Sequence, residues 1–261
     1  MKAVLVSGLG NMGKELIHTL ENHKDYKVAG VIEPLKTSDY FLTGDSKYQV
    51  FEKPEEALKE LEVDVVVDFT NATFTEKLAP IILGAGLNLV VGTSNLSDKT
   101  LETIEQDTNK NKAGCVVASN FALGAVLMMY FSKKAAPFYK KAEIIEKHHD
   151  KKVDSPSGTA METAKRISDS AVEDYESTVS EQEKLMNARG ASFNGINIHS
   201  VRSPGVVANQ EVIFSAEQEL LLIEHQTTGR QSFMPGVVLA IEYVLNNVGF
   251  TVGLEKVIGI E

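Results

Sequence analysis

The sequence predicts an α/β fold made of two parts: an N-terminal Rossmann-type, doubly wound parallel sheet and a C-terminal α+β part with an open mixed sheet. Two observations predict the first part. Short β-rich runs alternate with helical stretches over residues 1–120, and a glycine-rich turn directly follows the first run. A third observation predicts the second part, because beyond residue 120 this alternation stops and strand-like runs follow one another over short connections.

Five runs with the composition of buried strands define the first part. Helical stretches such as Met12–Asn22 and Ser97–Asn111 separate them. Parallel strands need a crossover of about this length between them, so the rhythm is that of repeated βαβ units. We therefore expect residues 1–120 to form a dinucleotide-binding domain. The expected strands are Ala3–Val6, Lys27–Ile32, Val63–Phe69, Leu87–Val91 and Cys115–Ala118.

The second part, residues 121–230, opens with an expected helix over Ala122–Phe138. A strand over Glu143–Lys147 follows, and another helix begins at about Thr159. Three runs with short connections are then expected to be antiparallel neighbours in a sheet. The helical pattern of Phe233–Asn247, within residues 231–261, is expected to return to the first domain. The three runs are Gly195–Arg202, Val206–Ala216 and Glu219–Thr227.

Composition limits the classes of function. The chain has 261 residues, 43% of them hydrophobic, which is enough for a buried core. Its formal net charge of -10 argues against a general nucleic-acid binder. No apolar run approaches the roughly 20 residues that span a bilayer, and the N-terminus lacks the pattern of a signal peptide, so we expect a cytoplasmic protein without a membrane partner. The single cysteine, Cys115, lies in an apolar run and is expected to be a buried thiol.

The glycine-rich turn predicts a dinucleotide site. A G-x-G-x-x-G motif is a weak signal alone, but here it lies between an expected strand and an expected helix. Its three glycines permit a tight turn, a close approach to a pyrophosphate, and packing of the helix on the strand. Glu33 ends the second strand, where such folds place the acid that binds the ribose hydroxyls; the alternative is an exposed strand-end carboxylate. The motif residues are Gly8, Leu9, Gly10, Asn11, Met12 and Gly13.

A second motif, over residues 146–160, has the composition of a catalytic segment. It reads E-K-H-H-D-K-K-V-D-S-P-S-G-T-A, with two histidines, three lysines and a Ser-Gly-Thr helix start. Imidazole can move a proton near neutral pH, lysine can supply positive charge, and the N–H groups of a helix start can bind an anion. A carboxylate-bearing substrate would suit this set. The alternative is a solvated cationic face before an ordinary capped helix.

Taken together, the motifs resemble the 4-hydroxy-tetrahydrodipicolinate reductase family, also called dihydrodipicolinate reductase, over nearly the whole chain. The specific element is H-H-x-x-K-x-D-x-P-S-G-T-A, and V-D-F-T (67–70), G-T-S (92–94), A-S-N-F (118–121), I-H-S-V-R (198–202) and G-R-Q-S-F-M-P-G (229–236) also fit. The resemblance implies that NADH or NADPH reduces a cyclic imine dicarboxylate, with loss of water, in lysine and diaminopimelate biosynthesis. It also implies a homotetramer built through the second domain, which would bind the substrate.

The resemblance implies a role for each motif residue. His148 would be the acid/base, Lys152 a proton donor and positive partner, and His149 a substrate contact. A substrate carboxylate would be held by Ser157, Gly158 and Thr159. No metal ligand is implied, and Arg230 could contact substrate or form a surface ion pair. The nicotinamide half of the cofactor would be lined by Gly92, Thr93, Ser94, Ala118, Ser119, Asn120 and Phe121.

One departure and two rival functions remain open. Many relatives carry Val-Gly-Glu-His where this chain has the run from Val207 to Gln210, and we expect this to affect substrate positioning or the subunit interface more than the chemistry. Another two-domain amino-acid dehydrogenase would not need the His-His-x-x-Lys element. A catalytically silent NAD(P)-sensing protein would need neither His148 nor Lys152.

Because Glu33 would repel a 2′-phosphate, we expect NADH to be used at least as well as NADPH, although Lys36 leaves that preference open.

Overall fold

The computed structural model describes residues 1–176 and 182–260, which form two compact units. The first unit comprises Met1–Phe121 and Phe233–Glu261, and the second comprises Ala122–Ser232. The limits of the second unit lie close to the expected limits at residues 121 and 230. In the part of the chain that the structure describes, no helix has the length and apolar character needed to cross a bilayer.

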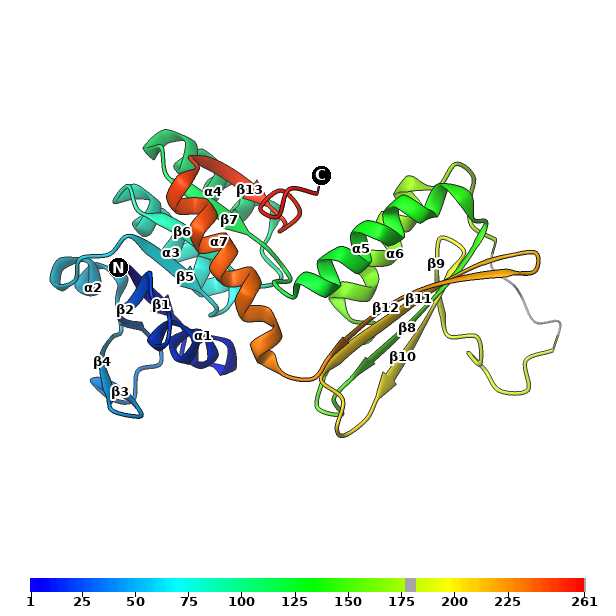
Figure 1. The fold of residues 1–261 in the computed structure, drawn as a ribbon, viewed down its shortest axis with the longest axis horizontal. Coiled ribbons are helices and arrows are strands. Elements are labelled where there is room, and N and C mark those ends of the chain that lie inside the picture. The colour runs from blue at the N-terminus through cyan, green and yellow to red at the C-terminus, as the bar shows by residue number, and fades with distance from the viewer. Residues whose placement is uncertain (177–181, 261) are drawn as a thin grey trace. The chain divides into compact units, whose positions relative to one another are not determined.

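The first unit is an eight-stranded sheet in the order β13-β7-β6-β5-β1-β2-β4-β3, with helices on both faces (Figure 1). All neighbouring strands are parallel except β3 and β4. The strands are β1 (Lys2–Ser7), β2 (Tyr26–Ile32), β3 (Tyr40–Thr43), β4 (Ser46–Phe51), β5 (Val65–Asp68), β6 (Asn88–Val91), β7 (Gly114–Val117) and β13 (Gly249–Val252). The helices are α1 (Asn11–Glu21), α2 (Pro54–Glu60), α3 (Ala72–Gly84), α4 (Asp98–Asn111) and α7 (Met234–Asn246).

Burial on both faces explains why the central strands consist of continuous apolar runs. Every residue of β5 and β7 is buried, and so are the last three residues of β6, as expected for parallel strands covered on each side. Helices α2, α3 and α4 form a hydrophobic core with one face of this sheet. Helix α1 packs on β1 and β2, and helix α7 packs on β5, β6 and β7. Cys115 is fully buried in this core, which confirms the expected buried thiol, and burial raises the pKa of that thiol to about 12.

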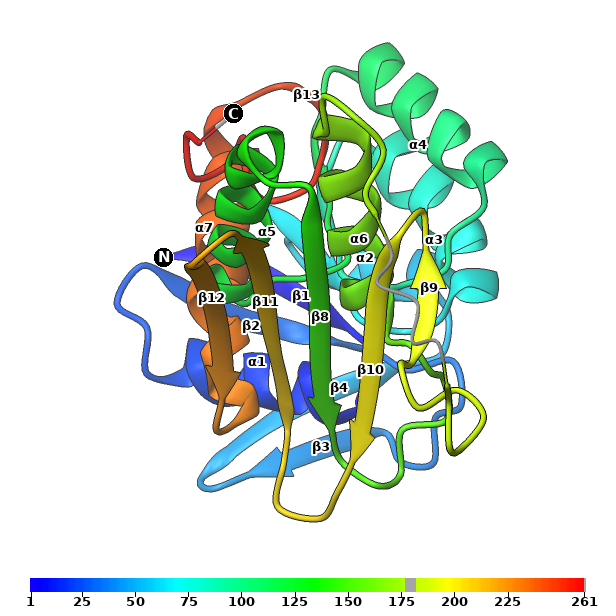
Figure 2. The ribbon, with the colours of Figure 1, turned by 90° about the vertical axis from the view of Figure 1, so that its right-hand side faces the viewer.

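The second unit is a five-stranded mixed sheet in the order β12-β11-β8-β10-β9 (Figure 2). Helices α5 and α6 pack on one of its faces. The α/β prediction, with a parallel sheet and a second mixed sheet, is therefore confirmed. The elements are α5 (Leu123–Ala135), η1 (Ala136–Phe138), β8 (Lys141–His148), α6 (Gly158–Ser170), β9 (Ala191–Phe193), β10 (Ile196–Arg202), β11 (Ala208–Ala216), β12 (Glu219–Thr227) and the 3-10 helix η2 (Arg230–Phe233).

The expected pairing of the last three strands is wrong in one respect. β11 and β12 do form an antiparallel pair, but β10 pairs in parallel with β8, so β8 separates β10 from β11. The prediction was based on the short connection over residues 203–207. A chain of this length can reach about 16 Å, whereas crossing one intervening strand requires only about 10 Å. A short connection therefore does not require the two strands to be neighbours.

The turn between β1 and α1 depends on two glycines in different ways. Gly8 has φ +99 and donates its N–H to the Ile32 carbonyl at 2.8 Å. A side chain at Gly13 would overlap the Gly8 carbonyl oxygen, because the first turn of α1 lies directly against the loop. Gly10 differs, since its backbone is extended and a Cβ there would meet no atom of the described residues within 4 Å. The fold therefore requires glycine at position 13 but not at position 10.

We predict that Gly13→Ala lowers the free energy of unfolding by about 1–3 kcal/mol, the usual cost of overpacking, because the clashing atom is backbone and cannot rotate away. Gly10→Ala, the matched control, should change it by less than roughly 1 kcal/mol. Urea unfolding without ligand, followed by circular dichroism, measures both. Equal transition midpoints for the two variants would contradict the packing argument.

Candidate functional site

The residues expected to hold a dinucleotide lie together at one edge of the eight-stranded sheet. The glycine-rich segment over residues 8–13, which includes the first turn of α1, follows β1; Glu33 follows β2, residues 92–94 follow β6, and residues 118–121 follow β7. Because these strands are parallel, all four segments lie at the carboxyl edge. The strand order reverses between β1 and β5, which is where open α/β sheets bind their ligands.

Glu33 is fixed against the glycine loop by backbone hydrogen bonds. Its Oε2 accepts from the Leu9 N–H at 2.7 Å, and its Oε1 accepts from the Leu35 N–H at 3.2 Å. A hollow of about 330 Å³ adjoins it, lined by both of those leucines and by Lys14, Lys36 and Tyr40 among others. Glu33 is therefore more than an exposed strand end, because its carboxylate has a fixed orientation beside a hollow that could hold a ligand.

Buried Asp68, which was not predicted as a site residue, connects the loop after β5 with the expected nicotinamide segment after β6. Its carboxylate accepts from the hydroxyls of Thr70 at 2.7 Å, Thr75 at 2.5 Å and Thr93 at 3.1 Å. Thr93 belongs to the expected nicotinamide segment, whereas Thr70 follows β5. A single carboxylate at the end of an apolar strand run was the signal in the sequence that could have found this residue.

Aromatic packing links the loops further. The rings of Phe69 and Phe121 meet edge to face at 5.8 Å, and a side chain at Gly92 would overlap the Phe69 ring. The loops after β5, β6 and β7 therefore pack as one surface. Within them Ser94 and Ser119 are exposed, as residues that line a ligand site can be.

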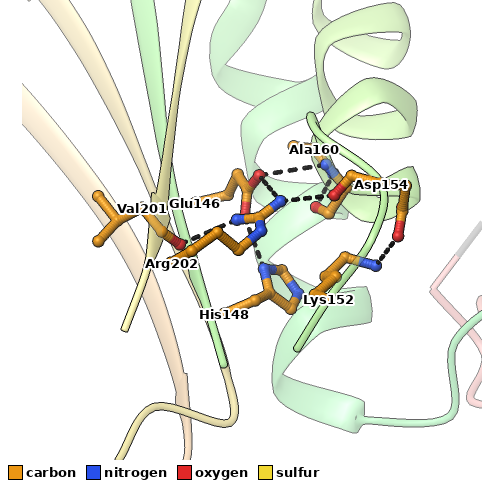
Figure 3. Close-up of polar contacts among 8 residues, drawn as sticks. Glu146, His148, Lys152, Asp154, Ala160, Val201 and Arg202 are labelled. Carbon is orange, nitrogen blue, oxygen red and sulfur yellow. Dashed lines mark hydrogen bonds and ion pairs between the residues drawn. The ribbon is translucent and has the colours of Figure 1, made fainter. Parts of the chain in front are cut away.

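The second candidate site is built around Glu146 on β8. Side chains alternate along this strand, so Glu146 and His148 share the face that packs against α5 and α6. Glu146 is fully buried, and its Oε2 lies 2.5 Å from His148 Nδ1. Arg202, the last residue of β10, donates from its two terminal nitrogens to the two carboxylate oxygens of Glu146, each at 2.8 Å (Figure 3).

The same two residues hold the loop that follows β8. The Ser157 N–H donates to Glu146 Oε1 at 3.2 Å, and Arg202 donates to the Asp154 carbonyl at 2.8 Å. Ser157 in turn caps α6, since its hydroxyl accepts from the Ala160 N–H at 3.2 Å. The start of α6, where Gly158 and Thr159 lie, is therefore fixed relative to the sheet.

The ionisation state of Glu146 follows from these contacts. Burial alone would raise its pKa, but hydrogen bonds from His148, Arg202 and Ser200 outweigh burial and lower the pKa from 4.5 to about 2. Glu146 is thus a carboxylate at neutral pH, and Arg202 supplies the opposite charge that a buried carboxylate requires.

The structure places the other motif residues in one short loop. β8 ends at His148, and His149 begins a turn that its carbonyl closes with the Lys152 N–H at 3.1 Å. The Lys152 ammonium donates to Asp154 at 2.7 Å (Figure 3). Glu146 and Arg202 were not predicted as site residues; a charged residue on the buried face of a strand was the signal for Glu146.

The departure at Asn209 and Gln210 lies inside the second unit. Gln210 is buried, is paired across the sheet with Glu146, and donates to the Thr163 hydroxyl on α6 at 2.8 Å. Asn209 accepts from the Thr227 N–H at 2.9 Å. Both side chains therefore make contacts within the unit. Arg230 is exposed, and its role stays a prediction.

Comparisons with known proteins agree with this architecture. The family model described as dihydrodipicolinate reductase, N-terminus, matches residues 2–121, and the one described as dihydrodipicolinate reductase, C-terminus, matches residues 124–258. The 4-hydroxy-tetrahydrodipicolinate reductase of Bacillus velezensis is 38% identical over 261 residues, covering 99% of this chain and 98% of that protein. The protein of the same name from Bacillus subtilis is 38% identical over 262 residues, with the same coverage.

Solved structures give the same result. A dipicolinate-bound dihydrodipicolinate reductase from Paenisporosarcina sp. TG-14 superposes with a TM-score of 0.88 at 36% identity, covering 98% of this chain and 99% of that one. An amine dehydrogenase from Mycobacterium smegmatis has a TM-score of 0.68 at 12% identity, with 98% and 95% coverage, and is similar in fold alone. On the two family models and the full-length similarity, this chain belongs to the dihydrodipicolinate reductase family.

Proposed function

We propose that this protein reduces 4-hydroxy-tetrahydrodipicolinate to tetrahydrodipicolinate with NADH or NADPH, in lysine and diaminopimelate biosynthesis. The observation that carries the proposal is the loop after β8, where His148 contacts buried Glu146, Lys152 closes the following turn, and Ser157 caps the start of α6. Relatives named for this activity are 38% identical to this protein over 99% of the chain, which supports the proposal.

The first unit provides features that fit a nicotinamide dinucleotide. Open space above Gly10 allows the backbone to approach a pyrophosphate, and the N-terminus of α1 favours its negative charge. Glu33, held by the Leu9 N–H, would accept from the ribose hydroxyls, and residues 92–94 and 118–121 would line the nicotinamide half. When bound, the cofactor supplies the hydride.

The second unit provides the groups for the dicarboxylate and the proton. A carboxylate would bind at the start of α6, to Ser157, Gly158 and Thr159, where the helix dipole favours an anion. His149 would contact the substrate, and Lys152 would add positive charge and a proton. The reaction takes up one hydride and one proton and releases one water. His148 acts as the general acid/base for that exchange.

The exposed face of the five-stranded sheet fits assembly into the homotetramer that we propose. Val201, Leu220 and Leu222 lie on the face away from α5 and α6, and their exposed fractions are 41%, 62% and 53%. Leu220 and Leu222 are neighbours on this face of β12, and adjoining exposed apolar side chains are typical of contact surfaces. We further propose that the protein acts in the cytoplasm, without a membrane or nucleic-acid partner.

The cofactor preference gives a prediction. Glu33 places negative charge where a 2′-phosphate would lie, and the nearby cation Lys36 already pairs with Asp39 at 2.9 Å. We expect kcat/KM with NADH to equal or exceed the value with NADPH. Glu33→Gln should improve NADPH use relative to NADH. Steady-state kinetics with both cofactors measure this, and a clearly higher kcat/KM with NADPH in the unaltered protein would overturn the expectation.

The reaction itself is tested by mixing the protein and NADH with the freshly formed condensation product of pyruvate and aspartate semialdehyde, and following the loss of NADH absorbance. We expect His148→Ala and Lys152→Ala each to lower kcat by roughly 10²–10⁴-fold, the usual range for general acid–base groups. The double variant should lose less than the product of the two factors, because groups that act as a unit are not additive.

Two controls make this test specific. Lys151→Ala removes a neighbouring, exposed lysine of the same loop and should leave kcat nearly unchanged. The affinity for NADH should be the same in all variants, because the pyrophosphate loop lies in the other unit. Near-normal turnover of Lys152→Ala would refute its role, and no NADH oxidation by the unaltered protein would refute the proposed reaction.

A further inference from the structure

One ring nitrogen of His148 is already engaged within the protein. Nδ1 lies 2.5 Å from Glu146 Oε2, and an ionised carboxylate can only accept a hydrogen bond. Nδ1 must therefore carry the hydrogen. In the neutral imidazole the lone pair then lies on Nε2, which makes Nε2 the ring nitrogen that can take up a proton.

Glu146 has no freedom to rotate away from this contact. It is fully buried, and each of its oxygens accepts one hydrogen bond from Arg202, so the carboxylate plane is fixed by a two-point contact. The Ser157 N–H adds a bond to Oε1. Without the guanidinium, a carboxyl group in this position would tend to take up a proton and could then donate to Nδ1 instead of accepting from it. Arg202 therefore maintains the acceptor that His148 needs.

We propose that Glu146 is a positioning residue that holds His148 with its hydrogen on Nδ1 and its proton-exchanging nitrogen at Nε2, and that Arg202 keeps Glu146 ionised for this purpose. The inference rests on the proposed function in assigning proton exchange to His148. When Nε2 takes up a proton, the adjacent carboxylate stabilises the imidazolium without accepting the proton itself, as in other carboxylate–histidine pairs.

The same strand contains a matched set of side chains on its other face. Glu143 contacts Arg189, and its Oε2 lies 2.8 Å from His199 Nε2, so a glutamate again lies between an arginine and a histidine. Because residues 143 and 146 differ by an odd number of positions, the two sets point to opposite faces of the sheet. Glu143→Gln is therefore a matched control, because it alters a Glu–Arg–His contact of the same strand on the face away from His148.

The test combines a spectrum with kinetics. ¹⁵N NMR of the ring nitrogens, with the His148 signals assigned by their loss in His148→Ala, reports the tautomer at about pH 9, where ordinary imidazoles are neutral. We expect the Nδ1–H tautomer in the unaltered protein. In Glu146→Gln one oxygen becomes an NH₂ donor, so the Nε2–H tautomer should become populated and kcat should fall by roughly 10²–10⁴-fold, the effect of a wrong tautomer. Glu143→Gln should change kcat by no more than about twofold.

Several results would overturn the proposal. These are the Nε2–H tautomer in the unaltered protein, an unchanged tautomer or a normal kcat in Glu146→Gln, or equal losses of kcat in Glu146→Gln and Glu143→Gln. Should Glu146→Gln fail to fold, the spectrum of the unaltered protein still decides the tautomer, and Arg202→Lys, which keeps one cationic donor, should retain Nδ1–H. The spectra need no substrate. An unaltered protein that lacks activity would therefore refute the proposed reaction while the tautomer is judged separately.

Discussion

Glu146 is a fully buried carboxylate that stays ionised because Arg202 reaches across from β10 and His148 and Ser200 contribute further hydrogen bonds. Loss of the Arg202 charge would leave Glu146 buried and uncompensated, which typically costs about 3–5 kcal/mol. The geometry of the second unit's site follows from this pair. The pair joins β8 to β10, fixes the Ser157 cap at the start of α6, and orients the imidazole that we assign to proton exchange.

A buried carboxylate organises the first unit as well, but with different partners. Asp68 ends the central strand β5 and accepts from three threonine hydroxyls, so it needs no cation beside it. Through Thr93 it fixes the loop expected to contact the nicotinamide. In both units an acid at the end of a central strand therefore connects loops that the chain places far apart. These connections arrange each candidate site before any ligand arrives, which is the condition for efficient transition-state stabilisation.

The sequence predicted the central parallel strands and the strands of the second sheet that bear the motifs, but it did not predict β3, β4, β9 or β13, and it predicted the lateral order less well. Strand and helix patterns are local, so the βαβ rhythm and the helix start at Ser157 could be read directly. The insertion of β8 between β10 and β11 could not, because strand order depends on contacts between distant segments. The cations of the motif around His148 are evident in the sequence. Glu146 could have been identified only from the alternation of β8, which places it on the same face as His148, two residues earlier. Arg202 gave no local signal, since its role depends on the register of β10 against β8.

Whether Glu146 is an ionised, buried acceptor is tested most directly by an NMR titration of its side-chain carboxyl carbon. We expect a pKa of about 2 for Glu146, so the group should remain ionised while ordinary glutamates protonate near 4.5. Because the folded pKa lies below the unfolded one, the stability that this group contributes is fully present above about pH 4.5 and is lost as the pH falls towards 2. A titration midpoint at or above 4.5 would contradict the account.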